Sequence, residues 1–217
     1  MNKTESEKMK ALAQIISVIF HPIFIPLYLA IIFVNSVFFP KIYKIFIIAT
    51  IAIFTCIIPL LFMLFKYLNG SISDFYVKER KKRTPIYIVS FVSYIICVVN
   101  LIHLQILQIA PFFLFVFVSS LVGVLVIMVI NFKWKISAHA CGAGVLCGAV
   151  FAFAYYLAAN PVLLFCSTIF IVGTIISSRL ALNAHTFGQV AAGFFVGLIF
   201  SLLPIIIFSF GFLSCEN

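Results

Sequence analysis

The chain has 217 residues, of which 65% are hydrophobic and only 9% are charged, and its mean hydropathy is +1.29. A soluble domain is about 45–50% apolar and about 25% charged, so this composition predicts an integral membrane protein: a single all-α domain, residues 1–217, built as a polytopic transmembrane helix bundle. The net charge is +9 and no acidic residue lies in an apolar run, which excludes buried carboxylate relays and carboxylate-rich metal cages and favours an anionic partner. The acidic residues are Glu5, Glu7, Asp74, Glu79 and Glu216.

Charged residues divide the chain into five uncharged runs, whose lengths predict how often it crosses the bilayer. A helix needs about 20 residues to cross about 30 Å of hydrocarbon. We expect about seven spans, or six if Pro22 and Pro26 bend the first run into a re-entrant segment. The runs are Ala11–Pro40 and Ile45–Phe65 with one span each, Thr84–Phe132 with two joined around His103–Pro111, Ile136–Ser178 with two broken at Asn160–Pro161, and Leu180–Cys215 with one.

Basic residues are distributed unevenly between the two faces that seven spans define. Twelve lie on one face and two, Lys41 and Lys44, on the other. Because cytoplasmic loops carry an excess of Lys and Arg, we expect a protein of the cell membrane with its N-terminus and the basic face in the cytoplasm. Four of the twelve could instead be there to bind a substrate, and without them the ratio is still eight to two. The twelve are Lys3, Lys8, Lys10, Lys66, Lys78, Arg80, Lys81, Lys82, Arg83, Lys133, Lys135 and Arg179.

Three short segments on the basic face hold most of the polar groups that could do chemistry. They are Lys78–Pro85, Lys133–His139 and Ser178–Gln189, and each lies where an apolar helix is expected to begin. Helix N-termini combined with Arg and Lys side chains form a site suited to phosphate. The segments also bring His139 and His185 to one surface. One imidazole can attack phosphorus while another donates a proton to the leaving oxygen, so the pattern points to phosphoryl transfer.

The same residues resemble the motifs of the type 2 phosphatidic acid phosphatase (PAP2) superfamily. Ser178-Arg179, followed after five residues by His185, matches the motif S-R-x5-H of that family. The segment Ser137-Ala138-His139 resembles its P-S-G-H motif, and the basic run that ends in Arg83-Thr84-Pro85 resembles its K-x6-R-P motif. The resemblance covers roughly residues 78–200, which would be the catalytic core.

The resemblance implies a role for each matching residue. His185 would be the nucleophile that becomes phosphohistidine, and His139 would protonate the leaving alcohol. Members of the family release phosphate from lipid phosphates, among them phosphatidic acid, phosphatidylglycerol phosphate and polyprenyl diphosphates, without a metal ion or cofactor. The residues that would bind the phosphate oxygens are Arg179, Ser137, Lys78 and Arg83, with Ser178 and Gln189 in support.

The chain also departs from the family pattern. Gln189 stands where the family has an Asp that orients the nucleophilic imidazole, and an amide oxygen can orient the ring but carries no charge. The Pro and Gly of P-S-G-H are replaced by Ile136 and Ala138. The Lys of the first motif falls on Tyr76, so Lys78 would substitute for it. Its competitors are Arg80, Lys81 and Lys82.

Two pairs of glycines spaced as G-x-x-x-G lie in the spans that begin at the two histidines. One pair is Gly144 and Gly148 and the other is Gly193 and Gly197. Small residues at this spacing let helices approach closely. We expect these spans to pack together and bring the histidines near each other, although either pair could instead form a homodimer seam.

The sequence alone leaves three functions open. The first is a PAP2-like phosphatase acting on a phosphate monoester or diphosphate of a lipid. The second is a catalytically impaired PAP2-fold protein that binds lipid phosphates without turnover, and the third is a small transporter. The expected partners are a phosphorylated lipid and the bilayer, with no nucleic acid, and the oligomeric state stays open. His21 and His103 are expected to be hydrated polar residues near the membrane surface.

Overall fold

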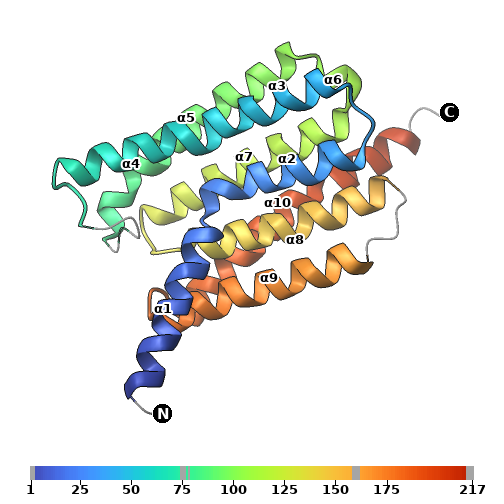
Figure 1. Ribbon diagram of the computed structural model, residues 1–217. Coiled ribbons are helices and arrows are strands. Elements are labelled where there is room, and N and C mark those ends of the chain that lie inside the picture. The colour runs from blue at the N-terminus through green and yellow to red at the C-terminus, as the bar shows by residue number, and fades with distance from the viewer. Residues whose placement is uncertain (1–2, 74–76, 78, 158–161, 214–217) are drawn as a thin grey trace.

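The computed structural model describes residues 3–73, 77, 79–157 and 162–213, and these residues form helices and connecting turns without any β-strand. Seven helical segments are long and apolar enough to cross a membrane, as the sequence predicts. The protein is therefore an all-α, multi-pass membrane bundle. Most of its long helices run roughly side by side along one axis (Figure 1).

The first segment is bent at two prolines. Helix α1 (Lys3–Ile19) is followed by a single 3-10 turn, η1 (Pro22–Phe24), and then by α2 (Ile25–Ser36). Because proline lacks an N–H and restricts the residue before it, the helix cannot run straight through this point. Helix α1 lies across one end of the bundle against α9, whereas α2 runs along the bundle axis (Figure 1).

The remaining spans break close to the predicted positions. The second consists of α3 (Lys41–Ile51), the π-helical turn η2 (Ala52–Ile57) and α4 (Ile58–Leu68). Helices α5 (Arg80–His103) and α7 (Pro111–Asn131) are joined through the short helix α6 (Ile106–Ile109). Then follow α8 (Ala138–Tyr156), α9 (Val162–Ala181) and α10 (Phe187–Leu213). The predicted break at Asn160–Pro161 lies outside the described residues.

Helix α8 is the most buried of the spans and packs against α10, α9, α7 and α2. The two glycine pairs face each other in the contact with α10. A Cβ added to Gly144 would collide with the backbone oxygen of Phe194, and one added to Gly197 would collide with the backbone oxygen of Cys141. Only glycine permits so close an approach of the two helices. The predicted close packing is thus confirmed within one chain, which leaves neither pair for a homodimer seam.

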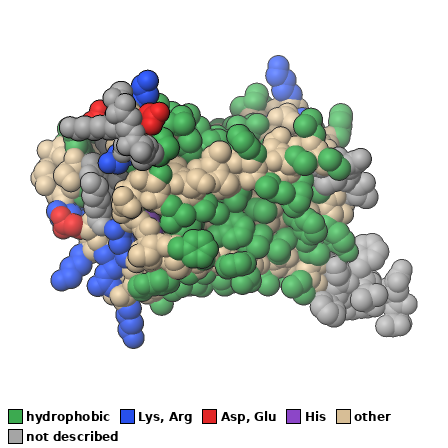
Figure 2. Space-filling view, turned by 90° about the horizontal axis from the view of Figure 1, so that it is seen from below, with side chains coloured by type: hydrophobic (Ala, Val, Ile, Leu, Met, Phe, Trp, Pro, Cys, Tyr) green, Lys and Arg blue, Asp and Glu red, His purple; other side chains and the backbone are tan. Residues whose placement is uncertain are grey.

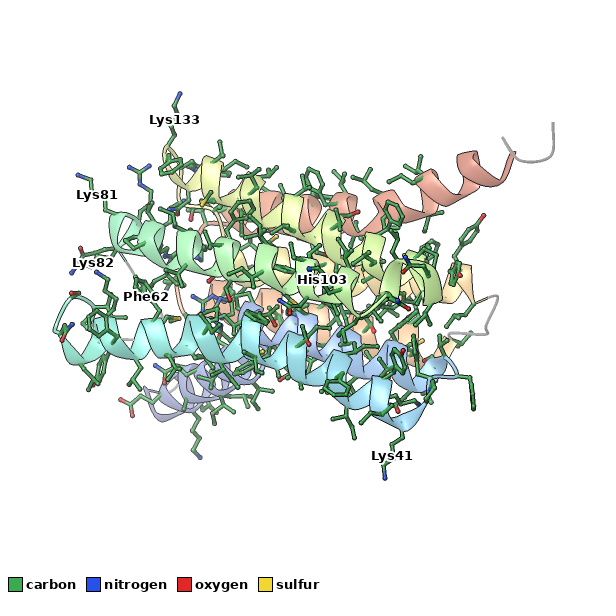
Figure 3. All side chains as sticks on the ribbon, turned by 90° about the horizontal axis from the view of Figure 1, so that it is seen from above. Lys41, Phe62, Lys81, Lys82, His103 and Lys133 are labelled. Atoms are coloured by element: carbon green, nitrogen blue, oxygen red, sulfur yellow. The ribbon has the colours of Figure 1, made fainter. Side chains whose placement is uncertain are left out.

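Charged and apolar side chains divide the surface into zones. Lys and Arg gather at one end of the bundle, next to a broad hydrophobic zone (Figure 2). Lys81, Lys82 and Lys133 lie at this end and Lys41 at the opposite end (Figure 3). The many exposed aliphatic and aromatic side chains along the bundle are those of a surface that faces lipid. We call the end with Lys81 and Lys133 the basic end.

Candidate functional site

A cavity of about 140 Å³ opens among the helices near the basic end. Its wall contains both histidines and two of the arginines that the sequence singled out. Arg83 comes from the first turn of α5, His139 from the first turn of α8, Arg179 from the last turn of α9, and His185 from the loop before α10. Three spans and the loop before a fourth therefore each deliver one of these groups to the same space.

His185 is held in one tautomer by Gln189. The Gln189 side-chain oxygen lies 3.1 Å from His185 Nδ1 and also accepts a hydrogen bond from the Thr186 backbone N–H, at 3.2 Å. Because this oxygen only accepts, Nδ1 must carry the proton and donate it. The other ring nitrogen, Nε2, then keeps its lone pair, which is the form that a nucleophile requires.

The charge state of His185 is set by its surroundings. His185 is only 8% exposed, and burial is the main reason why its pKa is lowered from 6.5 to about 4. The positive charges of Arg83 and Arg179 lower it further, the Gln189 hydrogen bond opposes the shift, and Lys135 has the smallest lowering effect. Both burial and nearby cations disfavour the imidazolium form. His185 is therefore neutral at pH 7.

His139 is positioned by the start of α8. The Ser137 hydroxyl caps this helix by accepting a hydrogen bond from the Ala140 N–H, at 3.3 Å. The His139 side chain extends to α1, where its Nε2 lies 3.0 Å from the backbone oxygen of Ser17. A carbonyl oxygen cannot donate, so Nε2 carries a proton in this arrangement. The site thus contains two different ring nitrogens. His185 Nε2 offers a lone pair, and His139 Nε2 donates a proton.

The two arginines are buried. Arg179 is 2% exposed and donates from Nη1 to the Ser17 hydroxyl at 3.1 Å, and that hydroxyl also lies 3.2 Å from the Ser178 hydroxyl. Arg83 donates from Nε to the backbone oxygen of Val77 at 2.6 Å. Buried guanidinium groups favour anions, because few other partners can compensate their charge in a low-dielectric setting.

Two residues of the site, His21 and Ser17, were not among the predicted site residues; for His21 the sequence predicts only a hydrated polar residue near the membrane surface. His21, at the bend between α1 and η1, lines the cavity, and its ring meets that of His139 edge to face with centroids 5.0 Å apart. Ser17, from α1, touches His139 and Arg179 and is fully buried. The sequence HPIFIP is a signal for His21 alone, because a bend there takes His21 out of the middle of a straight span, whereas no local signal marks Ser17.

The other predicted site residues fall into three groups. Ser137 and Ser178 form hydrogen bonds with the backbone of their own helices and do not line the cavity. Lys78 lies outside the described residues. Of its competitors, Arg80 donates to the backbone oxygens of Asn131 and Phe132 at the end of α7, Lys82 pairs with Glu79 at 2.8 Å, and Lys81 is exposed. Among the described residues of the basic run, Arg83 is the one that lines the cavity.

Within the described part of the chain, no three His, Cys, Asp or Glu side chains are placed to hold a metal ion together. Comparisons of the chain with models of protein families, with curated proteins and with solved structures find no match.

Proposed function

We propose that the protein is a PAP2-like, metal-independent phosphatase that hydrolyses a phosphate monoester or diphosphate of a lipid through a phosphohistidine at His185. One observation carries the proposal. A neutral histidine with a free ring nitrogen, a second histidine with a donating ring nitrogen and two buried arginines line one cavity of a membrane protein. The three motifs that resemble the PAP2 pattern supply these four residues.

The reaction would proceed in two steps. First, Nε2 of His185 attacks phosphorus, the bond between phosphorus and the leaving oxygen breaks, and His139, as the imidazolium that the negative charge of the bound phosphate would favour, gives that oxygen a proton and becomes neutral. Second, water attacks the phosphohistidine while His139 takes a proton from it, the bond between phosphorus and nitrogen breaks, and inorganic phosphate leaves. Arg179 and Arg83 would stabilise the negative charge on the equatorial oxygens.

Substrate binding requires a rearrangement around Ser17. The Ser17 backbone oxygen accepts from His139 and its hydroxyl accepts from Arg179. The phosphate oxygens would replace both acceptors, because they offer the same two donors a stronger, charged partner. Helix α1 would then shift at the bend that follows it.

The second candidate is a protein that binds lipid phosphates without turnover. Gln189 favours it, because the amide brings no negative charge to stabilise a cationic imidazole. The two functions are distinguished by a phosphate-release assay on purified protein with a panel of lipid phosphates and no added metal. We expect release that His185→Ala and Arg179→Ala each abolish. Release that persists in His185→Ala would refute the mechanism, and no release from any lipid would favour the binding protein.

The protein would lie in the plasma membrane with the basic end of the bundle facing the cytoplasm, because positively charged loops are retained on that side. A membrane-impermeant thiol reagent applied to intact cells tests this. Ser71→Cys, in the connection between α4 and α5 that leads to Lys81 and Lys82, should stay unlabelled. Lys41→Cys, at the opposite end, should react. The reverse pattern would place the site on the outer face.

A further inference from the structure

The cavity at the histidines continues into the interior of the bundle. A second cavity of about 60 Å³ lies beyond it. The two cavities share six wall residues and therefore lie next to each other between α2, α5, α7 and α8; we call the two together the apolar slot. The shared residues are Pro22, Pro26, Tyr94, Val124, Ile127 and Ala138.

The slot is deep. Arg83, Ser90 and Tyr94 lie on the same face of α5 and all line it. Tyr94 lies eleven positions after Arg83, and at about 1.5 Å per residue this is a depth of about 16 Å. The deeper cavity continues past Tyr94 to Leu29 and Phe117, both almost completely buried.

The charged and the apolar residues of the slot wall lie in different parts of it. Cations and imidazoles are confined to the mouth, and the deeper wall is mainly aliphatic and aromatic. Two of its hydroxyl groups donate back to their own helices, Thr55 to the Ile51 oxygen and Ser120 to the Val116 oxygen, both at 2.8 Å. Such a wall offers water few hydrogen bonds, and a ligand that fits it needs an anionic head and a long apolar body.

We propose that the apolar slot binds one hydrocarbon chain of the phosphorylated lipid inside the bundle, with the phosphate at the mouth and the chain running along α5 toward Tyr94 and Phe117. The proposal rests on the proposed function for the position of the phosphate. It adds that the enzyme selects a phosphate joined to a long hydrocarbon chain, because the slot extends about 16 Å from Arg83 to Tyr94 and continues to Phe117. Any part of the lipid that does not fit into the slot would remain in the bilayer.

The experiment uses dodecylphosphonate that carries a photoreactive diazirine at its terminal carbon. The full-length protein in lipid nanodiscs is irradiated with this probe, and the modified residues are mapped by mass spectrometry. A phosphonate has no bond that the phosphatase can cleave, so labelling is independent of turnover. We expect modification at the deep end of the slot, at Tyr94, Phe117 or Leu29. Labelling confined to residues that face lipid, such as Phe170 on α9, would overturn the proposal.

Two variants and a control make the result specific. Val124→Phe on α7 and Ser90→Leu on α5 each place a larger side chain in the slot. Each should lower the deep labelling by about tenfold or more, because overpacking a filled space is strongly unfavourable. Val122→Phe, two residues away on the lipid-facing side of α7, should label like the native protein. Undiminished deep labelling in both slot variants would contradict the proposal.

Phosphate release from dodecyl phosphate, measured on the same preparation, separates this inference from the proposed function. Deep labelling without release would keep the slot and refute the phosphatase. Release combined with labelling only at the lipid-facing surface would keep the phosphatase and refute the slot.

Discussion

The Gln189 side-chain oxygen accepts a hydrogen bond from His185 Nδ1 at 3.1 Å and one from the Thr186 N–H at 3.2 Å. The amide thus orients the imidazole as a carboxylate would, but without its negative charge. A carboxylate would stabilise the positive charge that the ring would gain in the proposed phosphohistidine.

Gln189→Asp should therefore raise kcat. An Asp supplies a negatively charged acceptor on a side chain one methylene shorter than Gln, and partners of this kind change activity by about 10- to 100-fold. Gln189→Leu removes the acceptor and should reduce kcat. Steady-state phosphate release measures both. If Asp and Leu have the same effect, Gln189 does not act through His185.

The low pKa of His185 predicts how its ring titrates. Burial and the charges of Arg83, Arg179 and Lys135 hold the pKa at about 4, so the ring should stay neutral as the pH falls through 6.5 and take up a proton only near pH 4. Arg83→Gln removes the largest of the charge effects and should raise the pKa, whereas Arg83→Lys keeps a positive charge and should change it little. Carbon-13 NMR of the labelled ring reports each titration. An unchanged titration in Arg83→Gln would contradict the assigned cause.

Ser17→Ala should weaken the fold and strengthen phosphate binding. Removing the hydroxyl deprives Arg179 of an acceptor, and hydrogen bonds to charged groups contribute about 1.5–3 kcal/mol, so the midpoint of thermal unfolding should fall. The same loss frees a donor for a ligand, so butylphosphonate should bind about tenfold more tightly. Calorimetry measures both effects. Ser167→Ala, which removes an exposed hydroxyl from α9, is the control and should change neither. Weaker binding in Ser17→Ala would mean that Ser17 has only a structural role.

The contact between α8 and α10 should be sensitive to a single methyl group. A Cβ at Gly197 collides with the Cys141 backbone, so Gly197→Ala should destabilise the protein by about 1–3 kcal/mol and lower its thermal midpoint. Gly173 on α9 has nothing within 4 Å of a Cβ, and Gly173→Ala should keep or raise the midpoint because Ala forms helix better than Gly. Equal effects of the two substitutions would refute the close-packing role.

Much of the fold follows from the sequence, because the length of an apolar run determines whether it can cross a membrane. The break between α5 and α7 lies within the predicted His103–Pro111, and α8 begins at Ala138, next to the predicted His139. Helix starts of this kind are local properties, set by turns and caps. The meeting of His139 and His185 also follows, since the number of spans places both at the same end.

The rest depends on tertiary packing. Pro22 marks a bend, but that α1 then lies across the basic end depends on its contact with α9, which no local pattern encodes. This is why Ser17 and His21 were missed as site residues. The rotation of α5 is also tertiary. It turns Arg83 into the cavity and leaves Lys81 exposed, although the two are only two residues apart.

The proposed intermediate is tested most directly by trapping it. Protein mixed with a phosphorus-32-labelled lipid phosphate is quenched in alkali, which preserves phosphohistidine, and digested for mass spectrometry. The proposal predicts one labelled histidine, His185, with the label absent from His185→Ala. Phosphate release without any label on His185, or with the label on another residue, would contradict the central claim.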